Sequence, residues 1–225
     1  MVDSTLSLPE ELLLLSTDNE SGHAVCSAST ALPFGLAGAA LIELALAGHV
    51  RLEDKQVKTA TNVHPPADEV LAQVLEVIRS SERTRSIQHW ITKVGGTSGK
   101  LKDAWYDRLV RKHILEREEG RVLLIFPTRR YPEMNPRPEI EIRDRIRAVA
   151  LGGARAGERT AALISLVHAC SLAGGLFEKD DRKEGKRRIK EISKGEPVGS
   201  SVSQAVAATI AAVVAATSAA STGAA

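Results

Sequence analysis

The segment from Leu36 to Ala47 constrains the fold of this chain most strongly. Nearly all of its residues are apolar or small, and Glu43 is its only charged residue. A helix that is apolar on every side must be buried, so this segment predicts a core helix. We expect Pro33 and Gly35 to prevent helix upstream of it, and Gly48 to end it with a left-handed cap.

The pattern changes from a helical to a strand period directly after Gly48. Residues 49 to 53 alternate polar with apolar side chains, which is typical of a half-buried strand. The polar run from Lys55 to Thr61 is expected to be the second arm of a hairpin. Helix, strand and hairpin together predict a winged-helix-like unit.

Apolar residues at helical spacing predict further helices along the chain. Ser7 and Glu10 stand at capping-box spacing and predict the start of the first helix. Pro65 and Pro66 are expected to open another. The remaining helices are predicted at 87–94, 101–114, 139–151, 160–173, 178–194 and 201–217.

The predicted fold class is therefore mainly α, with packed helices and short β-hairpins in one globular domain. We expect this domain to span residues 1–217 and residues 218–225 to form a flexible tail. In the helix at 139–151, the arginines at positions 143, 145 and 147 are expected to face outward.

A second hairpin is predicted near the middle of the chain. Residues 116–120 are expected to form a charged turn, and the apolar run from Val122 to Phe126 is expected to be a strand. The proline-rich segment from 128 to 138 predicts an exposed loop or hairpin tip that carries Arg129, Arg130 and Tyr131.

Composition limits the possible classes of function. The formal net charge of +2 provides no large basic field, which weighs against a nucleic-acid binder. Cys26 and Cys170 stand among small or apolar neighbours and are expected to be reduced thiols of a cytosolic protein. No signal peptide is evident, and the apolar run 205–216 is shorter than the about 20 residues that span a bilayer. Any membrane contact is therefore expected to be peripheral.

No catalytic or metal-binding pattern emerges from the sequence. The six histidines are scattered, and His168 is expected to be a hydrogen-bonded core residue. Glu43 is expected either to pair with an arginine or to cap a backbone group. The run GGTSGK ending at Lys100 lacks both the first glycine and the final Ser or Thr of a phosphate-binding loop. We expect no enzyme, no metal and no cofactor.

Basic residues at the ends of predicted elements are the remaining candidates for a binding site. Lys93, Lys100 and Lys102 flank the segment 95–99, and Arg187 and Arg188 belong to the charged helix. Such clusters suit an anionic membrane surface, where each charge contributes about 1 kcal/mol. A solvated face without a ligand is the alternative interpretation.

Two stretches of the chain resemble a known family. LPEELLLLSTDNESG from Leu8, followed by LIELAL, glycine and VRLED, is similar to the Golgi phosphoprotein 3 family of phosphoinositide-binding peripheral membrane proteins. RTAALISLVHA, from Arg159 to Ala169, also resembles a helix of that family. The resemblance implies binding of phosphatidylinositol 4-phosphate and contacts with other proteins.

The residues that hold the lipid head group in the family are mostly replaced here. The family's tryptophan falls on Ala28 and its arginine on Ala37, while its later basic pair falls on Gly99 and Lys102. Only Lys102 keeps its charge. Alanine cannot replace the bidentate phosphate contacts of arginine, so the resemblance implies a largely degraded pocket.

Three hypotheses follow from the sequence. The first is a peripheral membrane protein that uses Lys100 and Lys102 at a degraded or relocated lipid site. The second is a cytosolic interaction or scaffold protein whose 122–138 hairpin forms homo-oligomers, as a similar hairpin does in the family. The third is a nucleic-acid binder that uses Arg129, Arg130 and the helix around 108–112, which the near-zero charge disfavours.

Overall fold

The computed structural model describes residues 6–19, 21–23, 25, 30–61, 63–122, 126–194 and 204–222. It is mainly helical, as predicted. The helices are α1 (Leu8–Leu15), α2 (Leu32–Leu46), α3 (Glu69–Arg79), α4 (Ile87–Gly96), α5 (Ser98–Arg111), α6 (Arg137–Ala150), α7 (Glu158–Ala169), α8 (Arg182–Ser193) and α9 (Gln204–Thr222), with a short 3-10 helix at Ala173–Gly175. The strands are β1 (Val50–Glu53), β2 (Gln56–Thr59), β3 (Arg85–Ser86), β4 (Glu118–Val122) and β5 (Phe126–Arg130).

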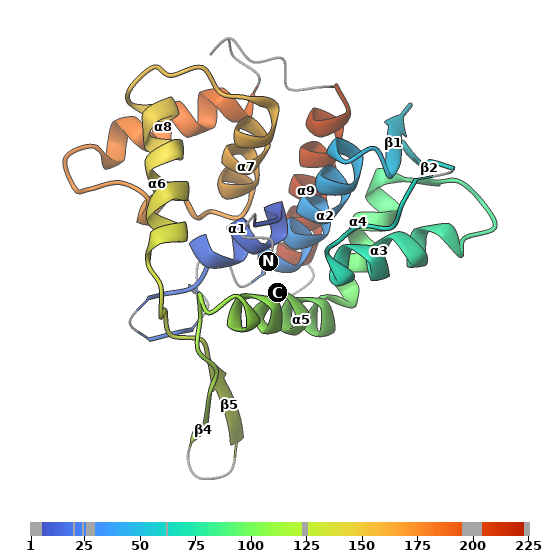
Figure 1. The fold of residues 1–225 in the computed structure, drawn as a ribbon. Coiled ribbons are helices and arrows are strands. Elements are labelled where there is room, and N and C mark those ends of the chain that lie inside the picture. The colour runs from blue at the N-terminus through green and yellow to red at the C-terminus, as the bar shows by residue number, and fades with distance from the viewer. Residues whose placement is uncertain are drawn as a thin grey trace.

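The predicted core helix is confirmed as α2, which lies at the centre of the molecule. Leu41 and Leu44 have no exposed surface, and α1, α4, α7 and α9 pack around the helix (Figure 1). The expectation that Pro33 and Gly35 prevent helix upstream was wrong, because α2 begins at Leu32. Proline is tolerated in a first turn, where its missing N–H has no helical partner to lose. Gly48 ends the segment at a φ of +74°, as expected.

The first hairpin is also confirmed. β1 pairs antiparallel with β2, which places Val50 opposite Thr59, and β3 adds a short third strand. α3 begins at Glu69 rather than at the prolines. The Asp68 carboxylate accepts hydrogen bonds from the N–H groups of Val70 and Leu71, and thereby sets the start of the helix.

The second hairpin differs from the prediction. β4 begins at Glu118 and takes in residues 118–120 of the expected charged turn, and its pairing brings Val122 opposite Phe126. Residues 123–125, which we assigned to a strand, lie outside the described residues. The arms are therefore 118–122 and 126–130, and the 128–138 segment begins in a strand. The hairpin extends away from the helices (Figure 1).

Helices α6 to α9 form the second half of the core. α6 buries Ile142, Ile146 and Val149 as predicted. Its arginines do not simply face outward, because Arg143 and Arg145 bond to Glu139 and Glu11 and retain only part of their exposure. The arginine at position 147 likewise donates to the carbonyl oxygen at position 176.

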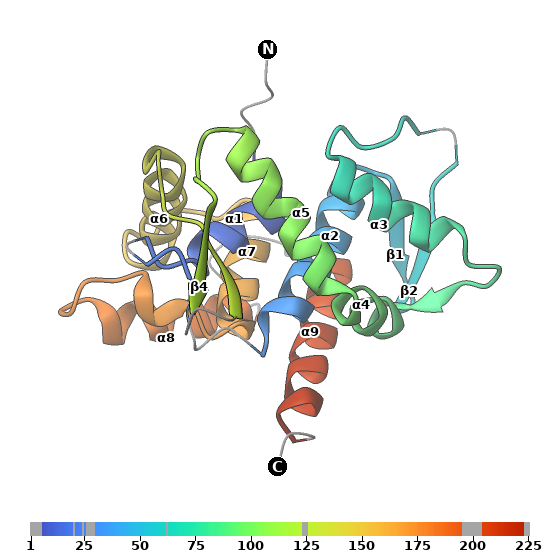
Figure 2. The same ribbon diagram turned by 90° about the horizontal axis from the view of Figure 1, so that it is seen from below.

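The ends of α7 and α9 also differ from the expected positions. α7 ends at Ala169, and Ser171 follows with a left-handed φ of +59°. α9 continues to Thr222, past residue 217 where we placed the end of the domain. No helix in the described part of the chain is both long and apolar enough to cross a membrane. Figure 2 shows α9 extending from the body on the side of α2 and α4.

Candidate functional site

The junction of α4 and α5 carries the lysines that the sequence analysis selected. Lys93 lies on the last turn of α4, and its Nζ is 5.2 Å from the ring centroid of Trp90. Lys100 is exposed and Lys102 is half-buried near the start of α5. We name these three lysines and Thr97 the α4–α5 junction. The expected 95–99 loop is shortened to Thr97, because the two helices take up the remaining residues.

The electrostatics of the α4–α5 junction favour an anion. Neither Lys100 nor Lys102 has an ion-pair partner within the part of the chain that the structure describes. The first turn of α5 contains no acidic residue, and a helix N-terminus carries about half a positive charge. Two ammonium groups without ion-pair partners thus stand near the start of α5, where the negative end of α4 at Thr97 offsets part of the positive charge.

The other family positions provide no cation in this structure. Ala28 lies outside the described residues. Ala37 is buried in α2 with 1% of its surface exposed, and Gly99 lies in the first turn of α5 with open space where a Cβ would stand. Of the aligned positions, Lys102 is the one that carries a positive charge.

The two arginines of the second hairpin that the sequence analysis selected are paired with acids. Arg129 lies 3.0 Å from Asp103, and Arg130 lies 2.9 Å from Glu118. The prediction of an exposed tip was wrong for Tyr131, which is 4% exposed and stacks on Tyr106 at a centroid distance of 3.9 Å. These three residues lie at the base of the hairpin, because β5 runs back toward the body.

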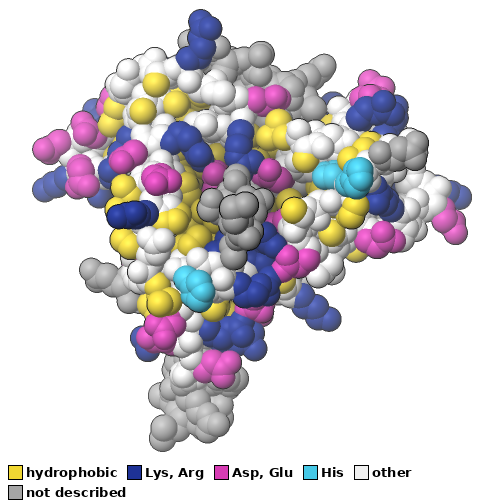
Figure 3. All heavy atoms as spheres, in the orientation of Figure 1, with side chains coloured by type: hydrophobic (Ala, Val, Ile, Leu, Met, Phe, Trp, Pro, Cys, Tyr) yellow, Lys and Arg dark blue, Asp and Glu magenta, His cyan; other side chains and the backbone are white. Residues whose placement is uncertain are grey.

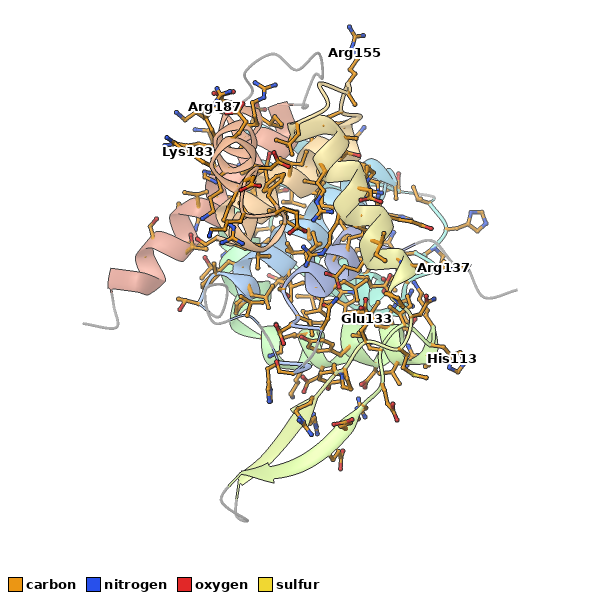
Figure 4. The ribbon with its side chains drawn as sticks, turned by 90° about the vertical axis from the view of Figure 1, so that its left-hand side faces the viewer. His113, Glu133, Arg137, Arg155, Lys183 and Arg187 are labelled. Atoms are coloured by element: carbon orange, nitrogen blue, oxygen red, sulfur yellow. The ribbon has the colours of Figure 1, made fainter. Side chains whose placement is uncertain are left out.

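The charged helix α8 is neutralised only in part, because it carries six basic residues and two acidic ones. Arg187 pairs with Glu184 and Glu191, and Arg188 lies 2.7 Å from Glu191. Figure 4 places Lys183 and Arg187 at the end of the molecule opposite the β4–β5 hairpin. On the face shown in Figure 3, basic and acidic side chains alternate rather than form one basic field. This pattern does not favour nucleic acid.

A cluster of buried charges around the start of α1 was not predicted from the sequence. Glu10 has no exposed surface, and its carboxylate accepts from Arg108 Nε at 3.2 Å and from Lys112 Nζ at 2.8 Å. Asp68 is 7% exposed and lies 3.3 Å from the same Arg108 nitrogen. The sequence held two local signals for this cluster, the capping-box spacing of Ser7 and Glu10 and the position of Asp68 before a helix, but neither indicated the cations. The cations at 108 and 112 proposed for nucleic acid are thus engaged internally.

Of the residues singled out as possible catalytic groups, Glu43 has structural partners, whereas no hydrogen bond of the His168 side chain is found among the described residues. Glu43 accepts from Arg159 Nη1 at 2.6 Å and from the Leu8 N–H at 2.6 Å, which confirms the structural interpretation. His168 is half-buried rather than fully enclosed, and burial together with Lys190 and Lys194 lowers its pKa. In the described ranges, no group of His, Cys, Asp and Glu could hold a metal ion.

Of the two cysteines, Cys170 lies within the described part of the chain. Cys170 is a free, buried cysteine, and burial raises its pKa to about 12. Its Sγ stands 2.3 Å from where a Cβ on Gly35 would be, so α2 and α7 approach closely at this point. Cys26 lies outside the described residues.

The sequence matches the model of a known family. A comparison with protein-family models matches residues 8–209 to Golgi phosphoprotein 3 (GPP34). The match starts at α1 and ends within α9, so it includes α2, the α4–α5 junction and the second hairpin. It covers far more than half of the 225 residues. This chain therefore belongs to the Golgi phosphoprotein 3 family.

Proposed function

We propose that this protein is a peripheral membrane protein that binds anionic phosphoinositide head groups at the α4–α5 junction. The observation that carries the proposal is the position of Lys100 and Lys102, two lysines without ion-pair partners in the described structure, at the positive end of α5. Family membership supports the same class of ligand, phosphatidylinositol 4-phosphate among them.

The lost pocket residues determine what kind of binding is expected. Ala37 is buried and cannot donate to a phosphate, so planar bidentate recognition is missing at this position. Lysine acts instead as a point charge. We therefore expect binding that follows the charge density of the membrane, with little preference for one phosphoinositide over another lipid of equal charge.

Co-sedimentation with liposomes tests this proposal. Vesicles that contain phosphatidylinositol 4-phosphate, or phosphatidylserine at matched charge, should bind the protein more than neutral vesicles do. Lys100→Ala combined with Lys102→Ala should weaken the partition by about 30-fold, since each charge contributes about 1 kcal/mol near an anionic surface. Added salt should weaken binding further.

A matched double variant controls for the loss of charge alone. Lys179 and Lys183 are exposed and lie at or next to α8, far from α5 (Figures 1 and 4). Changing both to alanine should leave the partition onto anionic vesicles within about twofold of that of the unmodified protein, because these charges do not face the bound membrane. The proposal fails if anionic vesicles bind no more protein than neutral ones, or if both double variants lose binding equally.

A second candidate function is protein interaction through the β4–β5 hairpin, used either for self-association or for contact with other proteins. The supporting observation is that this two-stranded sheet projects from the helices with both outer edges unpaired among the described strands. Such edges can pair with another chain. Light scattering should give a mass above 24.1 kDa that falls when residues 119–129 are replaced by a short Gly-Ser link. An unchanged mass would exclude self-association by this route.

A further inference from the structure

Helix α8 separates its charged residues by face. On one side, Arg187 and Arg188 pair with Glu184 and Glu191. The buried side contains Ile189. The third side carries cations without an acid, and we name it the α8 cation stripe: Arg182, Lys183, Lys186, Lys190 and Lys194. At about 100° per residue, these positions cover about 120° of the helix surface.

The side chains of the α8 cation stripe are exposed and have no ion-pair partner in the described part of the chain. Asp180 and Asp181 come directly before the helix, so they offset positive charge mainly at its start. Lys186, Lys190 and Lys194 lie further along. The C-terminal end of a helix carries about half a negative charge, which is less than the charge of these three ammonium groups. This part of the stripe therefore remains positive.

The spacing of the α8 cation stripe makes the isolated helix less stable. Arg182, Lys186, Lys190 and Lys194 follow one another at intervals of four residues. Like charges at this spacing are neighbours on a helix and repel each other. The acids on the opposite side show that α8 accommodates ion pairs, yet none relieves the repulsion here. A ligand of opposite charge would remove this repulsion.

His168 gives an independent sign of the positive potential. It lies in the last turn of α7, which packs against α8, and its side chain is half-buried. Burial lowers its pKa, and the charges of Lys190 and Lys194 lower it further. The potential of the α8 cation stripe thus acts on a residue of a second helix.

The geometry of the α8 cation stripe fits an extended acidic peptide. Four residues of a helix rise about 6 Å, and alternate side chains of an extended chain recur at about 6.6 Å. Single-stranded nucleic acid has phosphates to offer as well, but its bases normally stack on exposed aromatic rings. The ring that packs on α8, that of Phe177, is only 3% exposed. The stripe therefore favours a protein over nucleic acid.

We propose that the α8 cation stripe binds an acidic, extended peptide segment of a partner protein. Carboxylates on alternate residues of the peptide pair with Lys186, Lys190 and Lys194. The stripe from Arg182 to Lys194 is about 18 Å long, which about six residues of an extended chain can span. This site goes beyond the proposed lipid site and does not depend on it, because α8 lies far from the lysines of α5 (Figures 1 and 4).

Fluorescence anisotropy of a labelled octaglutamate peptide, titrated with the full chain at neutral pH, tests this site. We expect saturable binding that weakens as salt is added, because the charges are exposed. Octaglutamine, which has the same length without the charge, should not bind. Octathymidylate should bind more weakly than octaglutamate, because no exposed ring receives its bases.

Two double variants locate the binding on α8. Lys186→Ala combined with Lys190→Ala should weaken the binding of octaglutamate at least about fivefold, as expected for the loss of two exposed ion pairs. Lys100→Ala combined with Lys102→Ala removes the same charge from α5 and should change it by less than about twofold. The partition onto anionic vesicles should respond in the opposite way, so a failure of one proposal can be told from a failure of the other.

The titration of His168 reports on the same binding in the unmodified chain. Saturating octaglutamate should raise the pKa of His168, measured by nuclear magnetic resonance of its imidazole protons, because the bound carboxylates offset Lys190 and Lys194. Octaglutamine should leave it unchanged. The proposal is overturned if octaglutamate shows no saturable binding, if octathymidylate binds as tightly, if both double variants weaken binding equally, or if the pKa of His168 does not rise.

Discussion

Glu10 connects α1 to α5 although none of its surface is exposed. Its carboxylate accepts from the Ser7 N–H at 2.8 Å and pairs with Arg108 and Lys112. We expect Glu10→Ala to lower the free energy of unfolding by about 3–5 kcal/mol, because both cations lose a buried carboxylate. Denaturant unfolding followed by circular dichroism measures this change.

An exposed ion pair provides the control for Glu10. Glu184 pairs with Arg187 on the surface of α8. Glu184→Ala should leave the free energy of unfolding almost unchanged, because solvent already screens this pair. Similar losses in the two variants would contradict the structural role assigned to Glu10.

Cys170 should be almost unreactive in the folded protein. Burial raises the pKa of its thiol to about 12, while an ordinary thiol near 8.5–9 is about one-tenth ionised at pH 8. In a Cys26→Ser background, alkylation by iodoacetamide at pH 8 should be about 1,000-fold slower in the native state than in guanidinium chloride. Native labelling within about tenfold of the unfolded rate would show that the thiol is accessible.

The partners of single residues were the hardest feature to predict from the sequence. The apolar surroundings of Glu43 indicated a buried acid that either pairs with arginine or caps a backbone group. The structure contains both contacts, to Arg159 and to the Leu8 N–H. Arg159 is 116 positions further along the chain, and hydrophobic periodicity contains no information on contacts at that separation.

At the scale of elements, the close contact between α2 and α9 depends on Gly38, because glycine has no side chain. A Cβ on Gly38 would lie 2.4 Å from Val213 Cγ2, and valine has little freedom to move away. We expect Gly38→Ala to destabilise the protein by about 1–3 kcal/mol through overpacking. Thermal and denaturant unfolding measure the effect.

Gly96 provides the matching control for Gly38. A Cβ at Gly96, in the last turn of α4, would meet no atom within 4 Å. Gly96→Ala should therefore be neutral or stabilise by up to about 1 kcal/mol, because alanine favours helix. If the two substitutions have the same effect, the packing of α2 on α9 is not as close as described.

Helix interiors were predictable because their apolar periodicity is strong, whereas several element ends were not. α2 begins earlier than predicted because Pro33 fits a first turn. α3 begins later than predicted because Asp68, not the prolines, caps it. In the second hairpin, the polar β4 was mistaken for a turn because a projecting strand does not need an apolar face.

For the whole molecule, the lysines of the α4–α5 junction and the buried charges around the start of α1 differ in how far the sequence could predict them. Lys100 and Lys102 belong to one short segment, so their spacing was visible before the fold was known. The buried charge cluster around the start of α1 combines side chains from distant parts of the chain, for example Glu10 and Arg108, which are 98 positions apart. Such a site exists only after the helices have packed, and propensities of local segments cannot indicate it.

The packing of α9 against α2 also bears on how the protein is made. Ribosomes add about 5–20 residues per second, so α9 emerges on the order of 10–30 s after α2. During that interval, the face of α2 around Gly38 lacks the cover that Val213 later provides. The nascent chain therefore exposes this face until α9 has emerged, and a chaperone bound to the α2 segment would cover it during that time.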